Sequence, residues 1–162
     1  MFSFQFVSIS SPEYNIILRH NQTTLFSIVW EITPFLNWWL ANYKQLLAED
    51  FDNYLPFKQQ NANIAEILNN LHDLLYSNDS IISLNHTDNI RWQYVKSHAL
   101  YQGLQGSICP FIIIGLKNGI GQVSCFENNT TKWYYECSLI DYQNFIIETT
   151  QTVNQLKLAA ND

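Results

Sequence analysis

Charged side chains are scarce in this chain, and positively charged ones are the scarcest. Asp, Glu, Lys and Arg make up 14% of the 162 residues, only eight are Lys or Arg, and the formal net charge is −6. Nucleic-acid binding depends on Lys and Arg contacts to phosphate, so this composition argues against a nucleic-acid partner. The acidic balance allows a basic protein partner, although it also suits solubility alone.

Cysteine is also scarce. Cys109, Cys125 and Cys137 form an odd set without Cys-x-x-Cys spacing, which argues against a disulfide framework and a zinc or redox motif. We expect reduced, buried thiols in a cytoplasmic protein. Cys109 precedes Pro110 in apolar surroundings, which raise the pKa of a thiol and argue against a nucleophile.

Long apolar runs are absent, and no stretch approaches the roughly 20 residues that span a bilayer. The N-terminal segment Phe2–Ile9 alternates apolar and polar residues, without a positively charged start or a continuous apolar core. That alternation predicts a β-strand and not a signal peptide. We therefore expect no contact with a membrane.

Recognised catalytic motifs are missing too: the chain holds no GxGxxG, P-loop, GxSxG or HExxH sequence. His98 could serve as a ligand or general base, but Tyr94, Val95, Tyr101 and Gln102 stand at helical spacing from it. None of these is a Ser, a Cys or a carboxylate. We expect no catalytic residue, no cofactor and no metal site, and hence a protein that is not an enzyme.

Other possible metal ligands are too few to form a site. His72 and Asp73 are adjacent, and His86 and Asp88 lie in a polar segment near Asp79, without zinc-site spacing. Two ligands do not hold a metal ion.

Aromatic residues are abundant instead, with five Trp, nine Tyr and ten Phe. Trp30 and the pair Trp38–Trp39 form one patch, and a second runs from Trp92 to His98. Each buried Trp removes roughly 150–250 Å² from water, worth about 4–6 kcal/mol as an upper figure. These aromatic residues therefore tell more about how the chain folds than about any reaction that it catalyses.

Three strand-like runs open the chain and predict an antiparallel meander: Phe2–Ile9, Tyr14–Arg19 and Thr24–Trp30. Thr33 as N-cap and Pro34 in the first turn then predict a helix to about Ala48.

Two further helices are expected in the middle of the chain. The first spans Asn63–Tyr76 and begins with Asn63 and Glu66 at capping-box spacing. The polar segment 77–89 is read as a loop. The second helix spans Arg91–Leu104. This second helix places Trp92, Val95 and Ala99 on one side. The other side carries Arg91, Tyr94, His98 and Tyr101. The acidic residues Glu49, Asp50 and Asp52 after the first helix are read as a solvated loop, with a basic contact as the alternative.

The C-terminal third begins with a β-hairpin. Phe111–Leu116 and Ile120–Phe126 flank Asn118-Gly119, so a two-residue turn pairs Ile112 with Cys125 and Ile114 with Val123. A third strand over Trp133–Leu139 and a helix from Asp141 to about Ala160 complete the chain.

The order βββ–ααα–βββ–α separates strands from helices, which favours an α+β fold over a parallel sheet. We predict a single domain over residues 1–162. Its antiparallel sheet combines the N-terminal meander with the C-terminal hairpin and third strand, packed against about four helices.

A resemblance accompanies this pattern. Trp30, Trp38–Trp39, His98-Ala99-Leu100 and Pro110 stand where similar residues occur in the accessory N-terminal domain found upstream of bacterial ImmA/IrrE-type metallopeptidase domains. The chain departs from that domain at Ala99, where the domain has Ser, and at Cys125, where it has Trp. Since the peptidase HExxH is absent, the resemblance implies an accessory domain without proteolytic activity.

These observations predict a non-catalytic protein-interaction or sensory module of a bacterial defence, stress or regulatory system. Two aromatic helices carry more large rings than one face of each helix can bury, so we expect some of these rings to be exposed. Exposed aromatic residues favour binding to a partner. The alternatives are an acidic immunity protein that neutralises a toxin and a small hydrolase that uses His98. The predicted partner-binding residues are Trp38, Trp39, Arg91, Tyr94, His98 and Tyr101.

Overall fold

The computed structural model describes residues 1–54, 62–76 and 84–159. Within them the fold is α+β, as predicted, with the strands in two three-stranded antiparallel sheets. The elements are β1 (Phe2–Ser10), β2 (Glu13–His20), β3 (Thr23–Glu31), α1 (Ile32–Ala48), η1 (Phe51–Tyr54), α2 (Ile64–Tyr76), α3 (Leu84–His98), η2 (Leu100–Gln102), β4 (Phe111–Lys117), β5 (Ile120–Glu127), β6 (Thr130–Cys137) and α4 (Leu139–Ala159).

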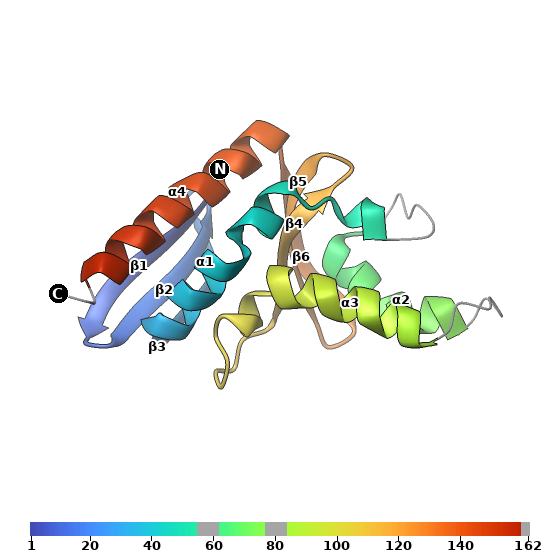
Figure 1. Ribbon diagram of the computed structural model, residues 1–162, viewed down its shortest axis with the longest axis horizontal. Coiled ribbons are helices and arrows are strands. Elements are labelled where there is room, and N and C mark those ends of the chain that lie inside the picture. Colours follow the sequence, from blue (N-terminus) through green and yellow to red (C-terminus); the bar gives the residue numbers. More distant parts are fainter. Residues whose placement is uncertain (55–61, 77–83, 160–162) are drawn as a thin grey trace.

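The elements form alternating layers (Figure 1). One sheet, β1-β2-β3, packs against α1 and α4, and these two helices contact each other and the second sheet, β4-β5-β6. Helices α2 and α3 cover the opposite face of the second sheet. The helix pair α1 and α4 therefore lies between the two sheets and buries apolar side chains on both sides.

The first sheet is a meander in which each strand pairs with the next. Phe4 lies opposite Leu18 and Phe6 opposite Ile16, so large apolar side chains share the face toward the helices. Successive residues on a strand point to opposite faces, and the other face carries polar residues such as Ser3 and Gln5. The alternation read from the sequence is confirmed.

The second sheet has the predicted hairpin register. Ile112 pairs with Cys125 and Ile114 with Val123 around a turn in which Asn118 and Gly119 have φ of 54° and 70°. These positive φ values are those of the two-residue turn that Asn-Gly favours.

The third strand of this sheet begins earlier than predicted. It spans Thr130–Cys137 and not Trp133–Leu139, because Asn128 and Asn129 form a second turn, with φ of 53° and 60°. A two-residue turn there allows pairing with β5 to start at Thr130.

The acidic residues after α1 have a structural role. The two carboxylate oxygens of Asp50 accept hydrogen bonds from the backbone N–H groups of Asn118 (3.1 Å) and Gly119 (2.7 Å). Asp50 also bridges to Leu116 at the edge of β4. Within the cluster read as a solvated loop, Asp50 therefore holds the segment after α1 against the Asn-Gly turn.

Three of the four predicted helix starts differ in the structure, and two of these concern the capping residue. Helix α1 begins at Ile32, and its cap residue Glu31 makes no side-chain capping bond, so Thr33 lies inside the helix. Helix α4 begins at Leu139, where Ser138 Oγ accepts from the Asp141 N–H at 3.1 Å and donates to the Asp141 carboxylate at 2.9 Å. Ser138 is therefore the cap of α4, and Asp141 is the third residue of the helix.

The start of α2 is as predicted, since Asn63 Oδ1 accepts from the Glu66 N–H at 3.0 Å. Helix α3 differs at both ends. It begins at Leu84, inside the predicted loop, of which residues 77–83 lie outside the described structure. It ends at His98 and not at Leu104, because Ala99 is extended (φ −88°, ψ 123°) and bridges Ile113 at the edge of β4.

Candidate functional site

Four of the six predicted partner-binding residues lie in the core. Trp39, Tyr94 and His98 are completely buried, and Trp38 is 8% exposed. A side chain without exposed surface cannot contact a partner while the chain stays folded. Arg91 and Tyr101 are half-buried and line a common pocket.

The two indole N–H groups of α1 are satisfied inside the protein. Trp39 Nε1 donates to Thr150 Oγ1 on α4 at 2.9 Å, and Trp38 Nε1 donates to the Lys96 carbonyl on α3 at 3.0 Å. Trp38 also lies against Gly103, where an added Cβ would approach its ring to 2.7 Å. Both rings join elements of the fold.

Tyr94 is buried because β4 has no side chain at the point where its phenol lies. A Cβ built on Gly115 would come within 2.1 Å of the Tyr94 hydroxyl oxygen. The Tyr94 ring stacks on His98, with centroids 3.8 Å apart, and meets Phe51 edge-on at 4.8 Å. The gap at Gly115 thus turns Tyr94 and His98 inward.

His98 is placed as a structural residue. Its Nδ1 lies 2.8 Å from Ser97 Oγ and 3.1 Å from the Tyr94 carbonyl oxygen, and its Nε2 is buried without a hydrogen-bond partner. Burial lowers the pKa of His98 to about 4, and the bond to the Tyr94 backbone offsets this only in part. The ring is therefore neutral at pH 7.

The cysteine thiols are protonated at neutral pH. Burial raises the pKa of Cys109 to about 12 and those of Cys125 and Cys137 to about 11. A thiolate is the reactive form of cysteine, so these side chains are poor nucleophiles.

No group of three His, Cys, Asp or Glu side chains that could hold a metal ion occurs in the described part of the chain. Of the ligands considered in the sequence, Asp79 and the side chains of His72, Asp73, His86 and Asp88 lie outside that part.

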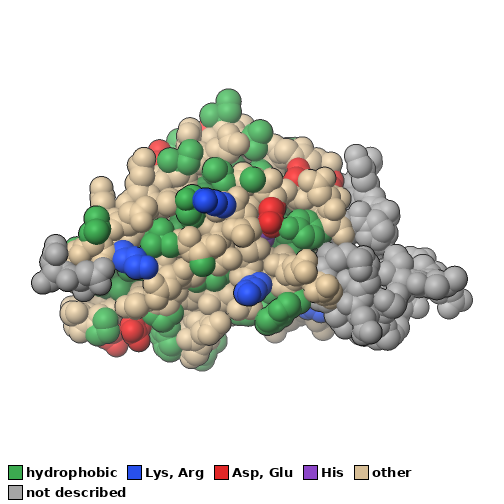
Figure 2. Space-filling model, viewed as in Figure 1, with side chains coloured by type: hydrophobic (Ala, Val, Ile, Leu, Met, Phe, Trp, Pro, Cys, Tyr) green, Lys and Arg blue, Asp and Glu red, His purple; other side chains and the backbone are tan. Residues whose placement is uncertain are grey.

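Positive charge is dispersed on one face of the molecule. On the face of the molecule in Figure 2, Lys and Arg side chains lie apart from one another, so this face offers no continuous basic surface. Among the described helices, none is long and apolar enough to cross a membrane.

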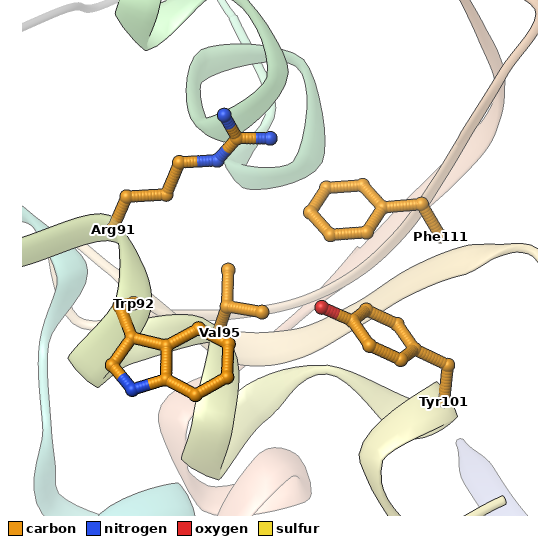
Figure 3. Close-up of a pocket in the computed structure, with 5 residues that line it drawn as sticks. All are labelled: Arg91, Trp92, Val95, Tyr101 and Phe111. Carbon is orange, nitrogen blue, oxygen red and sulfur yellow. The ribbon is translucent and has the colours of Figure 1, made fainter. Parts of the chain in front are cut away.

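The pocket that contains Arg91 and Tyr101 lies where α3, η2 and β4 meet. It has a volume of about 370 Å³ and is lined by Arg91, Trp92 and Val95 from α3, Tyr101 from η2 and Phe111 from β4. In Figure 3 the Arg91 guanidinium, the Tyr101 hydroxyl and the Phe111 ring point toward a shared space, and Val95 lies between Trp92 and Tyr101. Trp92 is 59% exposed.

The described lining of this pocket forms an apolar recess that contains the Arg91 cation. Arg91 makes no hydrogen bond or ion pair with residues 1–54, 62–76 or 84–159, so its planar guanidinium can bind a carboxylate through two N–H groups. The rings of Tyr101 and Phe111, 6.1 Å apart, supply apolar contact surface beside it.

Sequence reasoning missed Trp92 and Phe111 as pocket residues. It assigned Trp92 to the side of the helix opposite Arg91 and Tyr94 and named Phe111 as the first residue of a hairpin strand. Both faces of the aromatic helix carry large rings, so no periodicity in the sequence separates the buried face from the open one. The gap at Gly115, which decides between them, exists only once β4 has docked.

Comparison with known proteins adds no relative: no family model, curated protein or solved structure matches the chain. The resemblance to the ImmA/IrrE-associated accessory domain therefore stays a prediction.

Proposed function

We propose that this protein is a non-catalytic binding module. Its pocket between α3, η2 and β4 receives a segment of a partner protein in which an apolar side chain lies next to a carboxylate. The observation that carries this proposal is that Arg91 has no partner among the described residues, in a recess whose other described walls are aromatic and aliphatic side chains.

The wall residues support a protein partner. Trp, Tyr and Arg are the side chains that most often dominate the binding energy of protein interfaces, and here all three border one recess. Trp92 leaves more than half of its surface in water, and Ile108, in the segment between η2 and β4, is 99% exposed. Covering such apolar surface is favourable at about 25 cal/mol per Å².

The charge of the pocket selects the occupant. A purely apolar side chain would leave the Arg91 guanidinium half-buried without a counter-ion, which costs free energy. A neighbouring carboxylate would remove that cost by forming a charge-assisted pair. Volume agrees, because about 370 Å³ is at the small end of the range of ligand pockets and suits one or two side chains.

A peptide-display selection tests this assignment. We expect selection on the wild-type protein to enrich peptides with an acidic residue beside an aromatic or aliphatic one. The purified peptides should bind the Arg91→Gln and Trp92→Ala variants at least about tenfold more weakly than they bind the wild-type protein. The exposed α4 residue Ile147 provides the control, since Ile147→Ala should bind these peptides like the wild type.

Peptides that bind the wild type and Arg91→Gln equally well would refute the role of the guanidinium. Recovery of no specific peptide would refute the pocket as a protein-binding site. Trp92 is exposed, so its substitution should change the free energy of unfolding by no more than about 0.5 kcal/mol, which separates lost binding from lost folding.

A further inference from the structure

A second cavity lies on the face of the second sheet that α2 covers, near the N-terminal end of that helix. It has a volume of about 460 Å³ and is lined by polar side chains, among them Asn63, Glu66, Lys117, Gln122, Tyr134 and Glu136. None of its lining residues borders the pocket of Arg91. Its walls differ from that pocket because they carry charges of both signs.

One wall is fixed by Gln122, which is only 2% exposed. Its side-chain oxygen accepts from the Ile64 N–H at 2.6 Å, and its side-chain nitrogen donates to Glu136 Oε1 at 3.1 Å. Ser124 Oγ accepts from the Ala65 N–H at 3.2 Å. The first N–H groups of α2 are thus paired with side chains of β5 and are not available to an anion.

A second part of the lining is fixed by Asn63 and Thr131. Asn63 Nδ2 donates to Thr131 Oγ1 at 2.9 Å and to Glu66 Oε2 at 3.2 Å, and Thr131 Oγ1 donates to the same Glu66 oxygen at 3.2 Å. These bonds hold the Glu66 carboxylate in one orientation and occupy only one of its oxygens. The cavity is therefore bordered by positioned polar groups and not by freely rotating ones.

Lys117 brings a buried positive charge to this cavity. It is 7% exposed, and its ammonium donates to the Ala62 carbonyl at 2.6 Å. An ammonium has three N–H donors, and Lys117 forms no ion pair in the part of the chain that the structure describes. Since a buried charge without a counter-ion is costly, the geometry favours an anionic group beside Lys117.

The carboxylates supply the opposite preference. Glu66 Oε1 and Glu136 Oε2 accept no hydrogen bond from the described residues, and both side chains line the cavity. Tyr134, 52% exposed, adds an aromatic ring to the same lining. Two carboxylates and a ring form an environment that attracts an ammonium group.

We propose that this cavity binds a small zwitterion, a free α-amino acid, with its carboxylate beside Lys117 and its ammonium beside Glu66 and Glu136. A ligand with only one charge would leave either Lys117 or the two carboxylates unpaired, whereas a ligand with both charges pairs with both. The volume lies within the range of about 300–1,000 Å³ that is usual for small-molecule sites.

Titration of the full chain by NMR with individual amino acids tests the assignment, with acetate and methylamine as probes that carry one charge each. At least one amino acid should shift the backbone resonances of Lys117 and Gln122 in a saturable way. Acetate and methylamine should each bind at least about tenfold more weakly than that amino acid. Lys117→Met and Glu136→Gln should each lower the affinity for that amino acid about tenfold.

Glu136→Gln keeps an oxygen that can accept from Gln122, so it separates loss of charge from loss of the wall. Glu148→Gln on α4 and Trp92→Ala are controls that should leave amino-acid binding unchanged. Methylamine binding as tight as that of the amino acid, or an affinity unchanged by Lys117→Met, would overturn the zwitterion assignment. Absence of a saturable shift with every amino acid would overturn the site itself. Peptide binding at the Arg91 pocket is measured separately and does not depend on either result.

Discussion

Glycine and aromatic residues are paired in this core at the scale of single residues. Gly103 lies against Trp38, Gly115 against Tyr94 and Gly121 against Tyr142, and a Cβ at each position would come within 2.1 to 2.7 Å of an atom of that aromatic side chain. Each missing side chain leaves room for one ring. Packing at these places is close enough that one added methyl group should be felt.

The contact between Gly115 and Tyr94 gives a prediction by double substitution. Gly115→Ala should lower the free energy of unfolding by about 2–3 kcal/mol, because its Cβ would lie 2.1 Å from the buried Tyr94 hydroxyl oxygen. Tyr94→Phe should be nearly neutral, since that hydroxyl has no hydrogen-bond partner. In the Tyr94→Phe background, Gly115→Ala should cost about 1 kcal/mol or less, which urea unfolding measures.

Gly119→Ala is the matched control for this cycle. Gly119 has φ of 70° with no atom within 4 Å of an added Cβ, so its substitution acts through backbone strain alone and costs about 1–2 kcal/mol. That cost should be the same with Tyr94 and with Phe at position 94. A cost of Gly115→Ala that is independent of position 94 would contradict the steric explanation.

His98 predicts a loss of stability in acid. Its pKa is about 4 in the folded chain and 6.5 in the unfolded one, so the unfolded state binds the proton first as the pH falls. The contribution is complete above about pH 6.5 and is lost progressively toward pH 4, with roughly 2 kcal/mol lost between pH 7 and pH 5. NMR titration of the imidazole checks this directly: the ring should stay neutral at pH 5, and a midpoint near 6.5 would be inconsistent with it.

Burial was the least predictable property of single residues. The spacing of Tyr94 and His98 placed them correctly on one side of a helix, but it gave no reason to bury that side in preference to the side of Trp92. Trp92 has the larger apolar surface, yet it is the exposed one. The position of Gly115, far along the chain, decides the outcome, and spacing within a helix contains no information about it.

At the scale of elements, replacing Asp by Asn should lower the free energy of unfolding at Asp50 but not at Asp52. Asp50→Asn should cost about 1–2 kcal/mol, because Asn118 and Gly119 donate to different oxygens and one of these becomes an NH₂ group that cannot accept. Asp52→Asn should be neutral or stabilising, since both Asp52 oxygens are buried without hydrogen-bond partners. Urea unfolding at pH 7 compares the two variants, and an equal cost for both would contradict the capping role of Asp50.

The β4–β5 hairpin was predictable at this scale, whereas the end of α3 and the start of α4 were not. Asn118-Gly119 determines the hairpin register because only residues that tolerate positive φ form its turn, and that information is local. The end of α3 depends instead on the bridge between Ala99 and Ile113, a contact between distant parts of the chain. Ser138 was missed as the cap of α4 because Asp141, three residues later, is an equally good capping residue by type.

At the scale of the whole molecule, the sequence predicted the α+β class but not the division of its strands into two sheets. The order βββ–ααα–βββ–α is compatible with one sheet or two, since the turns specify only neighbouring strands. The division follows from α1 and α4, which carry apolar side chains toward both sheets and keep them apart. That property appears only when the burial of each helix face is known.

The shared helix layer predicts that both sheets unfold together. Phe2, Ile16 and Leu18 of the first sheet and Ile112 and Val123 of the second belong to one buried cluster with residues of α1 and α4. Because this cluster joins both sheets, they should unfold in a single transition, which would also support the single domain predicted over residues 1–162.

Hydrogen exchange in low urea tests this on one amide from each sheet, Leu18 and Val123. We expect the two amides to converge on the same free energy of opening. Phe145→Leu, a change on α4 between the sheets, should lower both values equally, by about 1 kcal/mol. Ile147→Ala on the exposed side of the same helix should leave both within about 0.5 kcal/mol. If Phe145→Leu lowered the free energy of opening at Leu18 but not at Val123, the two sheets would be separate cooperative units. The α4 contacts would then stabilise the first sheet alone.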